Sequence, residues 1–150
     1  VFDPMTGYVK LIDFVTAVNQ TTPKSIGLVG SENYCSPEMY SEIYYDGYKS
    51  DVWSLGVCLY QLLRRKLPWK YAKHDDDRFK QYLAVGEFTE KLDPSVDSLL
   101  KQILSPDVDK RPTIDQVNEN AWVQSIDSCT ETHRCRYNHI ENFKLNMHMH

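Results

Sequence analysis

The chain has 150 residues, which is enough for one domain with a hydrophobic core. Hydrophobic residues make up 41% and charged residues 25% of the chain, which is typical of a globular protein and excludes a disordered one. The formal net charge of −4 argues against a nucleic-acid partner, and no apolar run reaches the roughly 20 residues of a membrane-spanning helix, so no membrane insertion is expected.

Cysteine usage indicates a reducing compartment. Cys35, Cys58, Cys129 and Cys135 are irregularly spaced, and Cys58 lies in an apolar stretch that we expect to be buried. This pattern predicts no disulfide framework. The first ten residues lack the long apolar region of a secretion signal. We therefore expect a cytoplasmic protein.

The first third of the chain predicts a strand pair, a long loop and a short helix. Residues 8–14 alternate and are rich in β-formers, and turn residues precede them, so residues 1–14 are expected to end one strand and form a second. Residues 15–33 show no period and predict a loop. A short helix is expected to begin at Pro37 and to end at Asp46-Gly47.

Residues 50–63 predict the central helix of the domain. Their apolar side chains cover nearly the whole helix circumference, which is typical of a helix buried inside a core. Ser50 or Asp51 can cap the first turn, basic residues follow the last turn, and Pro68 is expected to stop the helix. By itself, this pattern is compatible with the core helix of any α-rich domain.

Two further helices and a last capped helix complete the expected bundle. Residues 77–85 carry an apolar face, and the preceding His74-Asp75-Asp76-Asp77 run fits a cap better than a calcium loop. Residues 94–104 have apolar side chains at helical spacing, and Thr113 can cap a last helix. Residues 127–150 form a polar tail whose cysteines and histidines fit no standard zinc pattern, so a frayed tail is favoured over a metal site.

Four short motifs follow one another in the chain: residues 10–14 (KLIDF), 30–38 (GSENYCSPE), 51–56 (DVWSLG) and 109–113 (DKRPT). In this order and spacing they resemble the C-terminal lobe of eukaryotic serine/threonine protein kinases. The resemblance implies a mainly α fold, with a short β-hairpin followed by a helical bundle around a central buried helix. It also implies that residues 1–126 are a partial kinase domain.

Asp13 stands where this family has the aspartate that binds the Mg²⁺ bridging the ATP phosphates. Without that resemblance, a lone aspartate after a strand is more often a turn or cap residue than a metal ligand. The resemblance therefore implies ATP and magnesium as cofactors of a complete parent kinase, and a protein as its substrate.

Residues 15–34 resemble an activation loop. Thr21, Thr22 and Ser25 are candidate phosphorylation sites, although each is also compatible with an ordinary solvated hydroxyl. Gly30-Ser31 resembles the pair whose hydroxyl faces the catalytic aspartate and helps to distinguish serine/threonine kinases from tyrosine kinases. Ser36-Pro37-Glu38 stands for the usual Ala-Pro-Glu.

The resemblance also implies a buried ion pair between Glu38 and Arg111, two residues with no reason to touch on sequence grounds alone. It assigns Asp51 to accept backbone N–H groups of the catalytic loop, and it makes Trp53 and Gly56 core-packing positions. A finer likeness is to fungal kinases that regulate nutrient permeases and potassium transport, and it rests on residues 63–72 and 77–80 together with Ala121-Trp122, Ile126 and Cys129.

Departures from the family pattern leave the function open. Val15 replaces the glycine after Asp-Phe, and the 150 residues contain no Gly-rich loop and no His-Arg-Asp catalytic loop. We expect the catalytic aspartate to lie upstream of Val1 and this chain alone to be inactive. The alternatives are a regulatory module that docks substrates or an intact kinase paralogue through Phe79 and residues 67–73, and a non-functional truncated copy.

Overall fold

The computed structural model describes residues 3, 9–18 and 24–127 of the chain. The described residues divide between two compact units: residues 18 and 24–124 belong to the larger unit, and residues 3, 9–17 and 125–127 belong to the smaller one. We describe each unit by itself. Within the described ranges, no helix has both the length and the apolar character to cross a membrane.

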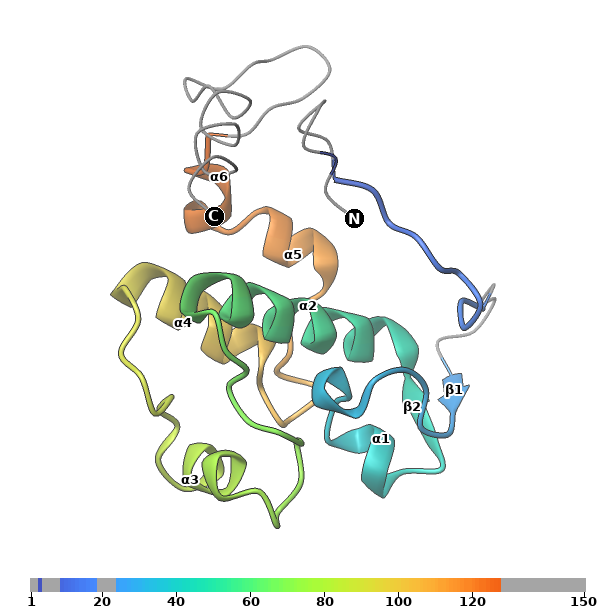
Figure 1. The fold of residues 1–150 in the computed structure, drawn as a ribbon. Helices are drawn as coiled ribbons and strands as arrows, with labels where there is room; N and C mark the ends of the chain where they lie inside the picture. Colours follow the sequence, from blue (N-terminus) through green and yellow to red (C-terminus); the bar gives the residue numbers. More distant parts are fainter. Residues whose placement is uncertain (1–2, 4–8, 19–23, 128–150) are drawn as a thin grey trace, which may run out of the picture. The chain divides into compact units, whose positions relative to one another are not determined.

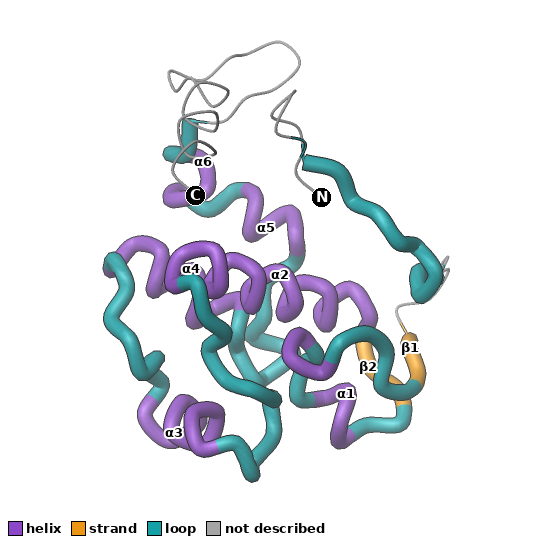
Figure 2. The backbone as a smooth tube through the Cα atoms, in the orientation of Figure 1, coloured by secondary structure: helices purple, strands orange, loops and turns teal. Residues whose placement is uncertain are grey.

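The larger unit is mostly helical, with a single short sheet among its described residues (Figures 1 and 2). Its elements are β1 (Lys24–Ile26), η1 (Glu32–Tyr34), α1 (Glu38–Ser41), β2 (Tyr44–Asp46), α2 (Gly47–Arg64), α3 (Asp77–Val85), α4 (Pro94–Ile103), α5 (Ile114–Asn118) and α6 (Ala121–Gln124). Helix α2 is the longest of them, and α4 packs along it.

The core forms where α2 meets α4, and an aromatic cluster extends it toward α3. From α2 it takes Val52, Trp53, Val57 and Tyr60, and from α4 and its C-cap it takes Val96, Leu99, Leu100, Ile103 and Leu104. Gly56 permits the close approach of the two helices, because a Cβ there would lie 2.4 Å from a methyl carbon of Ile103. Burial of such apolar side chains is the dominant stabilising contribution to folding.

The expectation that the central helix is buried all round is wrong. One face of α2 lies in the core, but Leu55, Leu62 and Leu63 on its other side are 43%, 80% and 40% exposed. Cys58, also expected to be buried, is exposed. Apolar periodicity identifies a helix but does not say which of its faces have neighbours.

The ends of α2 also differ from expectation. The helix begins at Gly47 and not at residue 50, and its cap is Asp46, whose carboxylate accepts from the backbone N–H of Lys49 at 3.1 Å. It ends before Pro68 is reached, because Arg65 adopts a left-handed conformation with φ of 56°. The backbone N–H of Arg65 still donates to the carbonyl of Gln61 at 2.7 Å.

The sheet is not formed by the segment that the sequence favoured. Of that segment, residues 9–14 are described, and they contain no strand apart from an isolated bridge at Val9. Instead, β1 arises inside the expected 15–33 loop and pairs antiparallel with β2, with Ser25 opposite Tyr45. The helix expected from Pro37 to Tyr45 is correspondingly short, since α1 ends at Ser41 and β2 takes its second half.

Three helices follow the sequence closely. The predicted bounds of α3 are confirmed, and α4 ends one residue earlier than expected. Thr113 caps α5, as predicted: it accepts from the backbone N–H of Gln116, whose side chain in turn accepts from the backbone N–H of Thr113. The last expected helix is divided into α5 and α6. Residues 128–150, which hold most of the expected polar tail, lie outside the described residues.

Asp76 caps α3 and also fixes the loop before it. One carboxylate oxygen accepts from the backbone N–H of Phe79 at 2.9 Å, and the other accepts from Lys70 at 2.9 Å and Tyr71 at 3.3 Å. Desolvation alone would raise the pKa of Asp76, but these backbone N–H groups outweigh it and hold the pKa below its usual value.

Replacing Asp76 with alanine should lower the free energy of unfolding by about 1–2 kcal/mol at pH 7. Because the folded-state pKa is depressed, the charged carboxylate stabilises the fold above the unfolded-state value of about 4, and this contribution is lost as pH falls through the folded-state pKa. Urea unfolding of wild type and variant at pH 7 and pH 3 should therefore show a smaller difference at pH 3. The exposed neighbour is the control: Asp75→Ala should have little effect at either pH.

Candidate functional site

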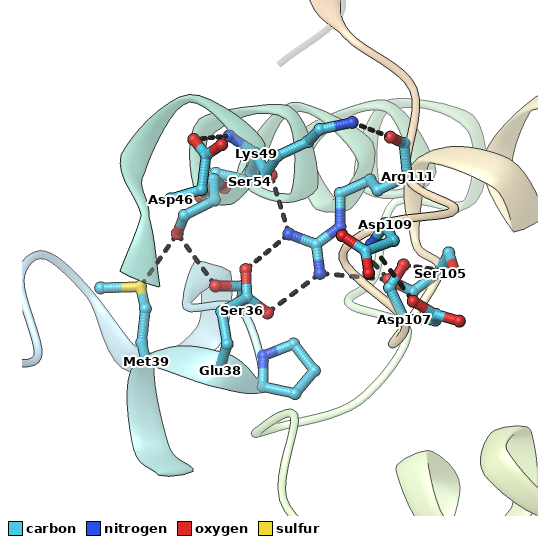
Figure 3. A network of polar contacts seen from close by, with 12 residues as sticks. Ser36, Glu38, Met39, Asp46, Lys49, Ser54, Ser105, Asp107, Asp109 and Arg111 are labelled. Carbon is cyan, nitrogen blue, oxygen red and sulfur yellow. Dashed lines mark hydrogen bonds and ion pairs between the residues drawn. The ribbon is translucent and has the colours of Figure 1, made fainter. Parts of the chain in front are cut away.

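Glu38 and Arg111 lie in direct contact and form the centre of the candidate site (Figure 3). The Nη1 atom of Arg111 donates to one carboxylate oxygen of Glu38 at 2.6 Å, and Nη2 donates to the other at 3.0 Å. Glu38 comes from the first turn of α1, and Arg111 from the connection between α4 and α5. The two residues are 5% and 1% exposed, so this is a buried, two-bond ion pair.

Every N–H group of the Arg111 guanidinium has an acceptor. Besides the two bonds to Glu38, Nη1 donates to the carbonyl of Lys49 at 2.8 Å, and Nη2 and Nε donate to the carbonyl of Ser105 at 3.1 and 3.2 Å. The guanidinium carbon also lies 5.0 Å from the ring centre of Trp53. This arrangement offsets the cost of burying the charge, and it joins α1, α2 and the residues after α4.

Buried hydroxyl groups join the same segment to α2. The Ser36 and Ser50 oxygens lie 2.9 Å apart, and Ser50 also contacts the sulfur of Met39 at 3.1 Å. One turn later, Ser54 donates to the carbonyl of Tyr34 at 2.9 Å. Residues 34–39 are therefore held against the first half of α2 by polar contacts as well as by the ion pair.

The three residues of the central-helix motif to which the family resemblance gives a role, Asp51, Trp53 and Gly56, divide into one exposed and two buried positions. Trp53 is 0% exposed, and Gly56 lies against Ile103 and Leu104. Asp51 is exposed, and partial desolvation by its neighbours raises the pKa of its carboxyl group. Trp53 and Gly56 thus pack in the core, whereas the binding role expected for Asp51 stays a prediction.

Asp13 belongs to the smaller unit. Its side chain is exposed, and its φ of 62° places it in the left-handed region, which aspartate tolerates better than most residues. Mg²⁺ typically takes one or two protein carboxylates together with phosphate oxygens, and an exposed Asp13 fits that requirement. Among the described residues, no cluster of three or more His, Cys, Asp or Glu side chains could hold a metal.

The candidate phosphorylation sites fall in different settings. Thr21 and Thr22 lie outside the described residues. Ser25 is half-buried in the middle of β1, opposite Tyr45. Ser31 is exposed and immediately precedes η1, and its carbonyl accepts from the backbone N–H of Tyr34 at 3.0 Å. Gly30 has φ of 89°, a conformation that favours glycine directly before Ser31.

Several contact residues escaped the sequence analysis. On sequence grounds Ser50 is expected only as a helix cap, Lys49 is expected in no site, and Lys73 is expected only as the last residue of the docking loop 67–73. The only signal for the hydroxyl pair was that Ser36 replaces the alanine usual in the resembling family. Phe79, expected as a docking residue, is 2% exposed and belongs to the core, because it packs against Trp53 and Trp69.

Comparison with protein families matches residues 1–123 to the protein kinase domain. The chain is 34% identical over 118 residues to serine/threonine-protein kinase PSK2 of Saccharomyces cerevisiae, covering 79% of this chain and 10% of that protein. It is 35% identical over 126 residues to CBL-interacting serine/threonine-protein kinase 20 of Arabidopsis thaliana, covering 79% and 28%. It is 28% identical over 140 residues to the probable serine/threonine-protein kinase RTK1 of Saccharomyces cerevisiae, covering 82% and 23%. The chain therefore spans less than a third of the length of each of these relatives.

Proposed function

Because this chain belongs to the protein kinase domain family, with serine/threonine kinases as its relatives, we propose that it supplies the activation segment and C-terminal lobe of such a kinase. Residues 1–126 would be the kinase part and residues 127–150 a tail. The complete cytoplasmic protein would transfer the γ-phosphate of ATP to a serine or threonine hydroxyl of a protein substrate.

The observation that carries this proposal is the buried Glu38–Arg111 pair. It joins two motifs that are 73 residues apart, and all its guanidinium donors are satisfied. The pair supports a structural role, in which it anchors the segment that follows Ser31. In this role, Arg111 would fix the end of the activation segment on α2 and would not touch the reacting atoms.

The exposed apolar side chains support a partial domain. Leu55 and Leu62 on α2 and Leu11, Phe14 and Val15 in residues 9–17 are all at least 43% exposed. Large exposed apolar side chains that gather on one face can mark an interface. We propose that the remaining parts of a kinase domain cover both groups of apolar side chains, the one on α2 and the one in residues 9–17.

Asp13 would hold the magnesium ion of MgATP, and the nucleotide supplies the phosphoryl group that is transferred. Gly30 and Ser31 would face the protein substrate. The fungal nutrient-permease and potassium-transport kinases remain our proposal for the subfamily, since residues 63–72 carry that likeness.

We expect no phosphate transfer by the purified 150-residue chain incubated with Mg²⁺, γ-labelled ATP and a serine- and threonine-rich protein. Phosphoryl transfer depends mainly on positioning the reactants and on stabilising the charge of the transition state, and a single metal-binding carboxylate does not provide these by itself. In a longer protein that joins this segment to the family's ATP-binding part, Asp13→Asn should lower kcat by about a hundredfold. Transfer by the short chain, or an unchanged kcat in the Asp13 variant, would refute the corresponding assignment.

A docking module without catalysis is the second candidate function. Its support is a pocket of about 380 Å³ between the loop before α3 and the start of that helix, lined by Leu67, Trp69, Lys70, Asp76, Asp77 and Arg78. Direct binding to an intact kinase of the same family, together with no transfer by the longer protein, would favour this function. A truncated copy without function would show neither binding nor transfer.

A further inference from the structure

The ammonium group of Lys73 lies between two aromatic rings and a carboxylate. It is 4.3 Å from the ring centre of Tyr40, 5.1 Å from that of Tyr71, and 3.5 Å from a carboxylate oxygen of Glu32. A cation within about 6 Å of a ring centre is attracted to the ring face. We name this group of four residues the Lys73 cage. It brings the loop before α3 together with η1 and α1.

The Lys73 cage is fixed on its loop side. Asp76 accepts from the backbone N–H groups of Lys70 and Tyr71, and it caps α3 at the same time. A second bond joins the loop to the η1 turn: the side chain of Asn33, the residue after Glu32, donates to the carbonyl of Lys70 at 2.9 Å. The backbone of the loop that carries Lys73 is therefore held in place by its bonds to Asp76, the N-cap residue of α3.

On the other side, the end of the η1 turn is held against α2, because Ser54 donates to the carbonyl of Tyr34 and the Tyr34 hydroxyl donates to Gln61, but the start of the turn is open. Ser31 and Glu32 are exposed, and the turn is a single three-residue 3-10 helix without a side-chain cap. The carbonyl of Glu32 accepts from the Tyr40 hydroxyl at 2.9 Å, so the same tyrosine contacts both the turn and Lys73. An isolated surface ion pair would be a weak restraint, but here the ring contacts and the Asn33 bond act on the same turn.

We propose that Lys73 is a positioning residue for the turn that follows Ser31, and that through this turn it sets the affinity of the kinase for its protein substrate. The second part rests on the proposed function, in which Gly30 and Ser31 face the protein substrate. Lys73 itself does not touch the reacting atoms. Its loss should therefore loosen the turn and weaken substrate binding without slowing the chemical step.

The first test is amide hydrogen exchange of the 150-residue chain, measured by NMR. Lys73→Met should speed exchange at Tyr34 and Cys35, whose N–H groups bond to the Ser31 and Glu32 carbonyls, by about fivefold, and Lys73→Arg should restore it. Lys101→Met is the matched control, because Lys101 also pairs with carboxylates but lies on α4. Unchanged exchange at Tyr34 and Cys35 in Lys73→Met, or an equal change in Lys101→Met, would overturn the positioning role.

The second test uses steady-state kinetics of the longer kinase that contains this segment. Lys73→Met should raise KM for the protein substrate by about threefold or more, with kcat and KM for ATP within about twofold of wild type, and Lys73→Arg should behave as wild type. A fall in kcat with an unchanged substrate KM would overturn the substrate part of the proposal. If no variant transfers phosphate, the proposed function fails, and hydrogen exchange alone then decides the positioning role.

Discussion

Replacing Arg111 with methionine should lower the free energy of unfolding by about 3–5 kcal/mol. The substitution keeps an unbranched side chain that fills the apolar part of the site but leaves the Glu38 carboxylate buried without its partner. It also removes the donors to the carbonyls of Lys49 and Ser105. Urea unfolding at neutral pH, followed by circular dichroism, measures the loss.

Two further variants separate the effect of the two-bond ion-pair geometry from the effect of removing a positive charge. Arg111→Lys should recover only part of the stability, since an ammonium group cannot bond to both carboxylate oxygens and both carbonyls in the same plane. Lys101→Met removes two partly exposed ion pairs, to Glu87 and Asp97, and should cost no more than about 1 kcal/mol. If Arg111→Met cost as little as Lys101→Met, the anchor that we assign to the ion pair would not exist.

Local periodicity is sufficient to predict α3 and α4. The apolar side chains of α4 recur at helical spacing and Pro94 suits its first turn, so the necessary information lies within about ten residues. The same holds for Thr113, whose capping box needs only Gln116 three residues later. These elements would be expected in almost any fold that buries their apolar faces.

The sheet could not be predicted in this way. β1 and β2 have three residues each, and their pairing depends on a register between segments about 20 residues apart. Tyr44 and Tyr45 follow α1 without an intervening breaker, so the sequence favoured a continuous helix there. Short strands with one buried side chain, here Tyr45, carry too little alternation to be recognised.

The contact between Glu38 and Arg111 was expected from the family resemblance, because nothing local connects two residues 73 positions apart. No family resemblance predicted the Lys73 cage. Its members come from three separate segments, and each is an ordinary surface residue in the sequence. A site whose geometry depends on tertiary packing becomes visible only once the loop before α3 is placed.

Replacing Trp53 with alanine should also cost about 3–5 kcal/mol, because the variant leaves a large cavity at the centre of the core. Trp53 is 0% exposed, and its ring centre lies 5.5 Å from that of Trp69 and 6.1 Å from that of Phe79. Trp53→Phe should cost less. It keeps a ring in the cluster and removes an indole N–H that has no hydrogen-bond partner within the described part of the chain.

Leu62→Ala is the matched control for Trp53→Ala, since Leu62 lies on the same helix but is 80% exposed and should change stability by less than about 0.5 kcal/mol. Urea unfolding followed by circular dichroism suits all these variants, because tryptophan fluorescence would change with the substitution itself. The Arg111 guanidinium lies over the Trp53 ring, so the two large effects share a contact. The double variant should therefore lose less stability than the sum of the single variants, whereas strict additivity would mean that the ring does not support the buried charge.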